Sequence, residues 1–81
     1  MLIVSQLRAA RGLVNWTQQV LAAGSGVALS TIRRMERGEG PIRGTAEIVW
    51  KVEAALERTG VVFIDSEEGV GGPGVRLKED T

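Results

Sequence analysis

The stretch LRAARGLVNWTQQVLAAGSGVALSTIRRMERGEG, residues 7–40, carries the signals that decide the fold. Apolar residues at helical spacing, followed by a glycine, predict a first helix near residues 4–13. Thr17 is a good N-cap, so a second helix is expected to begin there. This second helix is expected to be short, because the two glycines of the Gly-Ser-Gly run at 24–26 can adopt positive φ, and the run predicts a tight turn.

A third helix is predicted over about 28–37, because Gly38 and a following Gly-Pro pair stop it. At ~100° per residue, Ile32 and Met35 fall on one side of this helix. The opposite side is polar and carries Ser30, Arg33, Arg34 and Arg37. Two short helices joined by a glycine turn, the second with arginines on its outer face, are the layout of a helix-turn-helix that enters the DNA major groove.

The remaining sequence predicts one more helix and a pair of strands. Thr45 can cap a fourth helix that runs to about Arg58. The tail then changes period, with a β-type run at 61–64 and an alternating run at 75–78. A loop rich in glycine and acidic residues, 66–74, separates the two runs, so they are expected to form a hairpin.

The length of 81 residues suits one small domain, since two separate cores would each be too small to fold unaided. We therefore expect a single domain over residues 1–81, of mainly α class. It should consist of a compact bundle of four helices at about 4–58, which contains the helix-turn-helix, and a C-terminal β-hairpin at about 61–78.

The sequence lacks cysteine, histidine and tyrosine, and this excludes most catalytic and metal-binding chemistry. Without thiols or imidazoles there are no disulfides, no zinc sites of the usual kind, no thiol nucleophiles and no histidine bases. We expect no enzymatic activity, no cofactor and no bound metal. No apolar run is longer than the opening one, Met1 to Val4, and this length is too short for a signal peptide or a membrane span, so we expect a cytoplasmic protein without membrane contact.

The net charge of zero hides an asymmetry between the two halves of the chain. Six basic and two acidic residues occur through Arg43, whereas four basic and eight acidic residues occur from Gly44 onward, giving +4 and −4. A cationic half suits a nucleic acid, because neutralised phosphates release counterions and that release drives binding. Charges scattered on a solvated surface are the alternative reading of the same pattern.

Several spaced elements in residues 7–40 resemble those of one protein family. The matching elements are LRAARG at 7–12, Trp-Thr-Gln at 16–18, Leu-Ala at 21–22, Gly-Val at 26–27, Thr-Ile-Arg-Arg at 31–34 and Glu-Arg-Gly-Glu-Gly at 36–40. Together they resemble the helix-turn-helix of the Xre family, the Cro and phage-repressor type, and the tail is similar to a short bacterial single-domain form. The resemblance implies a nucleoid-associated transcriptional regulator, foremost a repressor, that binds specific sequences of double-stranded DNA with the third helix.

The resemblance also implies roles for individual residues. The expected base-reading residues are Ala28, Leu29, Ser30, Arg33 and Arg34. The expected phosphate contacts are Thr17 and Gln18 at the start of the second helix, and Arg37 and Arg43 from the cationic half. Arg11 and Glu36 match a pair that forms an ion pair between the first and third helices in family members.

Three residues depart from the family pattern. Val20 stands where an acidic residue is common, so the reciprocal capping box with Thr17 is lost. Ala28 replaces the usual Ser or Thr at the start of the third helix, which typically costs ~0.5 to 2 kcal/mol of capping. Leu29 stands where a polar or basic reader is frequent. It cannot donate to guanine, but its methyl groups can touch a thymine methyl.

An interface with another chain is indicated by Trp50, which points away from the apolar stripe of the predicted fourth helix. Aromatic residues are enriched at interface centres, and the open edges of a two-stranded hairpin can pair with another chain. We therefore expect a homodimer whose interface includes Trp50, Val62 and Ile64. Two alternatives remain open: the indole lies flat over Lys51 or the hairpin, or the chain is an antitoxin-like or adaptor module that binds a protein partner through Trp50 and the hairpin, with accessory DNA binding.

Overall fold

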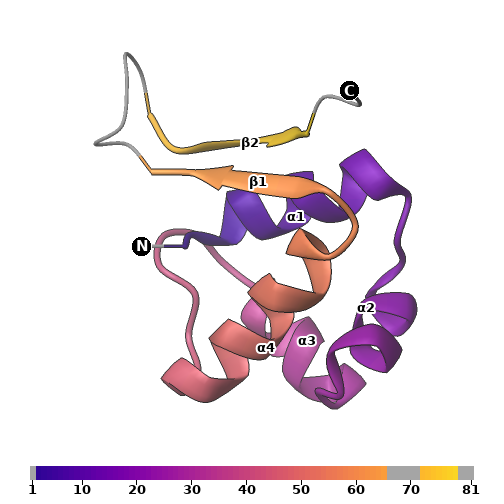
Figure 1. Ribbon diagram of the computed structural model, residues 1–81. Helices are drawn as coiled ribbons and strands as arrows, with labels where there is room; N and C mark the ends of the chain where they lie inside the picture. Colours follow the sequence, from indigo (N-terminus) through magenta and orange to yellow (C-terminus); the bar gives the residue numbers. More distant parts are fainter. Residues whose placement is uncertain (1, 66–71, 79–81) are drawn as a thin grey trace.

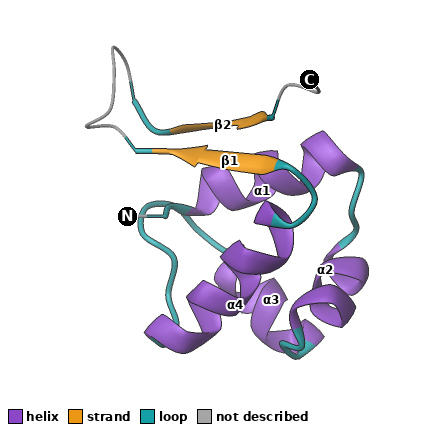
Figure 2. Ribbon diagram, viewed as in Figure 1, coloured by secondary structure: helices purple, strands orange, loops and turns teal. Residues whose placement is uncertain are grey.

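The computed structural model describes residues 2–65 and 72–78, and in this part of the chain four helices are followed by two antiparallel strands. The elements are α1 (Val4–Val14), α2 (Gln18–Ser25), α3 (Leu29–Met35), α4 (Ala46–Glu57), β1 (Val61–Ile64) and β2 (Gly74–Leu77). The strands lie beside α1 and the end of α4, whereas α2 and α3 lie at the opposite end of the molecule (Figure 1). Figure 2 shows the predominance of helix, which confirms the predicted mainly α fold.

Helix α1 forms because its apolar residues recur on one face. Val4, Leu7 and Ala10 are buried on that face. The helix ends at Asn15, whose φ of 55° places it in the left-handed region, which asparagine tolerates better than most residues. The observed end lies one residue beyond the predicted one, because Val14 is still helical.

Helix α2 is capped as predicted but is longer than predicted. The Thr17 hydroxyl accepts a hydrogen bond from the backbone N–H of Val20 at 3.1 Å. The helix then continues through Gly24 and Ser25 to Gly26, which alone turns left-handed at φ 72°. The expectation that all three residues form the turn is therefore wrong. Gly24 serves a packing role instead, since a Cβ there would lie 3.2 Å from the Trp16 ring.

Helix α3 is shorter than the predicted range of 28–37. Ile32 and Met35 are buried in the core, as the wheel predicts, but the helix ends at Met35. At Glu36 the backbone leaves helical geometry, with φ −91° and ψ 2°. Arg37 therefore lies beyond the helix, in the turn that leads to the left-handed Gly38 at φ 77°. The physical reason is that both the carboxylate and the carbonyl of Glu36 are held by side chains of α1, as described below.

Helix α4 begins where predicted, because the Thr45 hydroxyl accepts a hydrogen bond from the N–H of Ile48 at 3.2 Å. Its inner face packs against α2 and β1. The core of the described residues consists of Leu7, Ala10, Leu21, Val27, Ile32, Met35, Val52, Ala55, Leu56 and Val61. All four helices and β1 therefore share one hydrophobic cluster.

The segment between α3 and α4 is fixed to the start of the chain. Ile3 and Pro41 form an isolated antiparallel bridge. The N–H of Val4 donates to the carbonyl of Gly40 at 2.9 Å, and the N–H of Ile42 donates to the carbonyl of Leu2 at 3.3 Å. These backbone bonds hold the connection against α1 although it has no regular structure of its own.

The two strands form the predicted hairpin, with Val61 opposite Leu77 and Ile64 opposite Gly74. The second strand begins at Gly74, one residue before the predicted start, while the intervening residues 66–71 of the predicted loop lie outside the described part of the chain. Val61 and Phe63 pack toward the core, so Val62 and Ile64 point to the other face of the sheet.

Gln6 joins α1 to both strands, a role that sequence reasoning did not identify. The residue is only 3% exposed. Its Nε2 donates to the carbonyls of Ile64 at 3.0 Å and Gly74 at 3.1 Å, and its Oε1 accepts from the N–H of Ile3 at 3.0 Å. The buried amide is thus satisfied on both sides, and the hairpin is held on the helical bundle.

We predict that Gln6→Ala destabilises the fold by about 1 to 3 kcal/mol, because it leaves the carbonyls of Ile64 and Gly74 without their side-chain donor. Urea unfolding measures the loss, and amide hydrogen exchange of β1 and β2 should accelerate more than that of α2. Gln19→Ala, at an exposed glutamine, is the matched control and should change neither. Equal stability of the two variants would contradict the role of Gln6.

Candidate nucleic-acid interface

The five residues expected to read bases lie on or at the start of α3. Ala28 is the N-cap and makes no side-chain capping bond, so the helix starts without the hydroxyl that usually stabilises it. Ser30, Arg33 and Arg34 are exposed, whereas Leu29 is half-buried. With Ile32 and Met35 turned inward, α3 is an amphipathic helix whose polar face is open to solvent.

The arginines of the chain divide into two groups by their contacts. The guanidinium groups of Arg33, Arg34, Arg37 and Arg43 are exposed and have no hydrogen bond or ion pair within the described residues. By contrast, Arg8 donates to carbonyls of the turn after α3, Arg11 pairs with Glu36, and Arg58 donates to the Gly24 carbonyl at 3.0 Å. Among the arginines without such a partner in the described residues, only Arg76 of β2 lies away from α3 and the segment that follows it.

Arg11 and Glu36 form a two-point ion pair that joins α1 to the end of α3. Arg11 Nε lies 2.6 Å from Glu36 Oε2, and Arg11 Nη2 lies 2.6 Å from Oε1. The side chain of Glu36 is 4% exposed and that of Arg11 is 21% exposed, so the pair is largely shielded from water. Hydrogen bonding to Glu36 raises the pKa of the Arg11 guanidinium despite its partial burial, which keeps it charged.

The same ion pair reaches the start of α2. Arg11 Nη1 donates to the carbonyl of Trp16 at 2.9 Å, directly before the N-cap. Gln18 Nε2 donates to Glu36 Oε1 at 3.3 Å, so one expected phosphate ligand is already in contact with this network. The second N–H of that amide is left for another acceptor. Thr17, the other expected ligand in α2, uses its hydroxyl as an acceptor for the cap.

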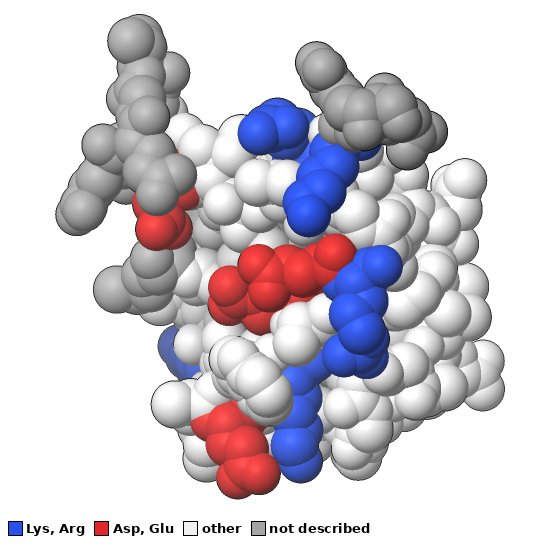
Figure 3. Space-filling view, viewed as in Figure 1, with Lys and Arg blue, Asp and Glu red and all other residues white. Residues whose placement is uncertain are grey.

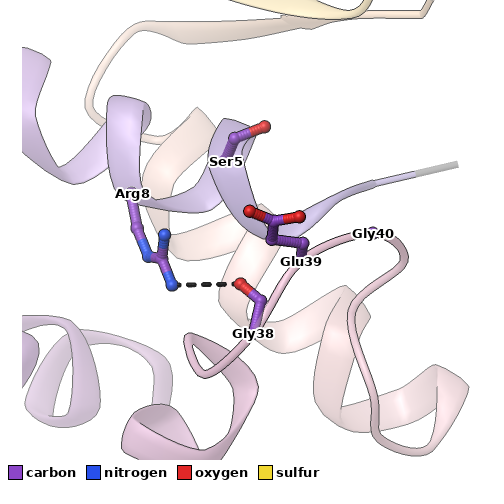
Figure 4. A pocket seen from close by; sticks show the side chains of 5 residues that line it. All are labelled: Ser5, Arg8, Gly38, Glu39 and Gly40. Atoms are coloured by element: carbon purple, nitrogen blue, oxygen red, sulfur yellow. Dashed lines mark hydrogen bonds between the residues drawn. The ribbon is translucent and has the colours of Figure 1, made fainter.

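Arg8 is a second link between α1 and the turn after α3, and sequence reasoning missed it. Its Nη2 donates to the carbonyl of Glu36 and, at 3.2 Å, to that of Gly38. Arg8 lines an open pocket of about 310 Å³ with Ser5, Gly38, Glu39 and Gly40 (Figure 4). The sequence feature that could have identified Arg8 is its position three residues before Arg11, which places both arginines near one face of α1.

A different surface is presented by α4 and the strands. Trp50 is 67% exposed, so its indole contributes little to the core. Acidic and basic side chains are interleaved over this face of the molecule (Figure 3). Burial raises the pKa of Glu53, and the charges of Glu57 and Asp65 raise it further. The other two expected interface residues, Val62 and Ile64, are half-buried.

The described residues hold no cluster of acidic side chains arranged to bind a metal ion. None of the helices in the described ranges combines the length and apolar character that crossing a membrane requires.

We predict that Glu36→Gln destabilises the fold by about 3 kcal/mol, because a shielded Arg11 loses its counter-charge. The double variant Arg11→Met, Glu36→Met should recover part of that loss, since no unpaired charge remains. Thermal and urea unfolding measure both effects. Glu39→Gln, at an exposed carboxylate three residues away, is the control. If Glu36→Gln is as stable as the wild type, the ion pair between Arg11 and Glu36 is not required for stability.

Comparison with known proteins gives the family of the chain. A family model described as helix-turn-helix matches residues 7–63, which include α1 from Leu7 onward, all of α2, α3 and α4, and most of β1. No curated protein matches the sequence. The matched range contains the α2–turn–α3 unit and the open arginine face of α3. The chain therefore belongs to the Xre-type helix-turn-helix family, whose domains bind DNA and are not enzymes.

Proposed function

We propose that the protein is a transcriptional regulator that binds specific sequences of double-stranded DNA and represses by occupying a promoter. One observation carries the proposal: four of the five arginines without a partner in the described residues lie on α3 or in the segment between α3 and α4, and only Arg76 lies elsewhere, whereas Arg8, Arg11 and Arg58 are engaged within the fold. Cations left free at one surface are what phosphate neutralisation and guanine recognition require. As a DNA-binding regulator, the protein acts in the cytoplasm at the nucleoid.

The proposal assigns distinct roles to the two helices of the motif. Helix α3 enters the major groove, where Arg33 and Arg34 bind guanine O6 and N7. The start of α2 faces the phosphate backbone through Thr17 and Gln18, where unpaired N–H groups favour an anion. Further phosphate contacts come from Arg37 and Arg43. The phosphate contacts set the register, and the contacts of α3 with base edges select the sequence.

We also propose that the protein acts as a homodimer through α4 and the outer face of the sheet. The support is the exposed Trp50, together with Val62 and Ile64 on the sheet face turned away from the core. The hairpin itself does not require a dimer, because Gln6 holds the strands on α1 without a second chain. A two-fold dimer would present two copies of α3 to half-sites about one DNA turn, ~34 Å, apart.

A second candidate function is favoured by Trp50 alone. In this case the chain is an antitoxin-like or adaptor module in which the face around Trp50 binds a different protein and DNA binding is accessory. Salt separates the two functions, because binding driven by phosphate contacts weakens steeply as salt rises, whereas binding through an apolar interface does not.

We predict that Arg34→Ala lowers the discrimination between specific and random duplexes by about 1 to 3 kcal/mol, because it removes a base contact. Gln18→Ala should weaken binding to all duplexes alike, because it removes a phosphate contact. Fluorescence anisotropy on an operator selected from a random duplex pool, over a salt series, measures both. Arg76→Ala, at an exposed arginine of β2, is the control. Equal losses on specific and random DNA for both variants would refute these roles.

We predict that light scattering at micromolar concentration gives the mass of two chains, and that Trp50→Ala shifts it toward one, because an exposed indole at an interface centre contributes strongly to association. Leu13→Ala, at an exposed apolar residue of α1, should leave the mass unchanged. A wild-type mass of one chain that Trp50→Ala does not alter would contradict the dimer.

A further inference from the structure

Leu29 is set apart from the other large apolar residues of α3. Ile32 is 0% exposed and Met35 is 1% exposed, and both belong to the core cluster. Leu29 is half-buried and belongs neither to that cluster nor to the partly buried hydrophobic residues packed against it. Its isobutyl group therefore lies at the surface of α3 without a share in the core.

The position of Leu29 relative to the arginines is informative. Arg33 follows it by four residues, so the two side chains lie about 40° apart around the helix and about 6 Å apart along it. Successive base pairs are 3.4 Å apart. The two side chains are thus close enough to contact neighbouring base pairs at the same time when α3 lies in the major groove.

The chemistry at the start of α3 differs from that farther along the helix. Ala28 and Leu29 carry no side-chain donor or acceptor, whereas Arg33 and Arg34 carry unpartnered guanidinium groups. In the major groove, the thymine C5-methyl is the apolar feature that an aliphatic side chain can contact, and guanine O6 and N7 suit arginine. An aliphatic residue offers nothing to the polar edges of the other bases there.

We infer that Leu29, with Ala28 beside it, reads the C5-methyl group of a thymine that lies close to the guanine bound by Arg33. The inference rests on the proposed function, because it names the base chemistry that this recognition helix selects. The ligand is a half-site in which a major-groove methyl and a guanine stand close together. Leu29 is then a specificity-determining residue through apolar contact.

The test uses two random duplex pools, one synthesised with thymine and one with deoxyuridine, which lacks only the C5-methyl. Wild-type protein should enrich a motif with thymine near guanine from the first pool. When that thymine is replaced by deoxyuridine in the selected duplex, affinity should fall about fourfold, which corresponds to about 0.8 kcal/mol for one buried methyl group. Replacement of thymines elsewhere in the duplex should have no effect.

Two variants assign the effect to its residue. Leu29→Ala should bind the thymine and deoxyuridine duplexes equally, because the apolar contact is gone. Arg33→Ala should lose preference for the guanine but keep the sensitivity to the methyl group. Circular dichroism shows that each variant retains its helices, and Leu13→Ala, at an exposed leucine of α1, is the matched control that should keep the full methyl effect. Leu29→Ala that keeps the full methyl effect would overturn the assignment.

Different results would overturn the DNA-binding function and the role of Leu29. Selective binding of a motif in which no thymine methyl matters overturns the role of Leu29 and leaves the DNA-binding regulator standing. Equal binding of all duplexes, with no motif enriched from either pool, overturns the proposed function and the role of Leu29 with it. A fourfold loss confined to one thymine in each half-site supports both.

Discussion

The carboxylate of Glu36 is the point on which the geometry of the DNA-binding unit depends. It accepts two hydrogen bonds from Arg11 of α1 and one from Gln18 of α2, while its own residue marks the end of α3. Three helices thus meet at one acidic group that is 4% exposed. Because a shielded carboxylate must be fully partnered, the angle and the length of α3 are both constrained by its neighbours.

The same requirement explains how the arginines are divided. Arg8 and Arg58 donate to backbone carbonyls and keep their positive charge, whereas Arg11 is neutralised by Glu36, and all three connect parts of the fold. The arginines on α3 and after it have no such partner in the described residues. Arginine therefore has two roles in this chain: some arginines connect parts of the fold, and others remain available at the surface. Only the tertiary contacts distinguish the two groups.

How far the sequence predicts the fold depends on whether a signal is local. The helix starts at Thr17 and Thr45 are correct because a cap needs only a hydroxyl and an N–H three residues later. The end of α3 is not predicted, because it depends on the distant partner Arg11. The close approach of Gly24 to the Trp16 ring is not predicted either, because it is a packing contact and not a local signal. The role of Gln6 was invisible for the same reason, since its acceptors lie 58 and 68 residues away. At the DNA face, the wheel separates inward from outward side chains, but it does not reveal that Gln18 touches Glu36.

The long reach of Gln6 has a consequence for how the chain acquires its structure. Its amide joins α1 to β1 and β2, so these bonds close only after the chain has been synthesised beyond Gly74 and has left the ribosome. Helix α1 also supplies Arg8 and Arg11 to the turn after α3. The turn after α3 is therefore connected through α1 to β2. A nascent chain that ends before β2 lacks the Gln6 bonds that hold α1 against the strands.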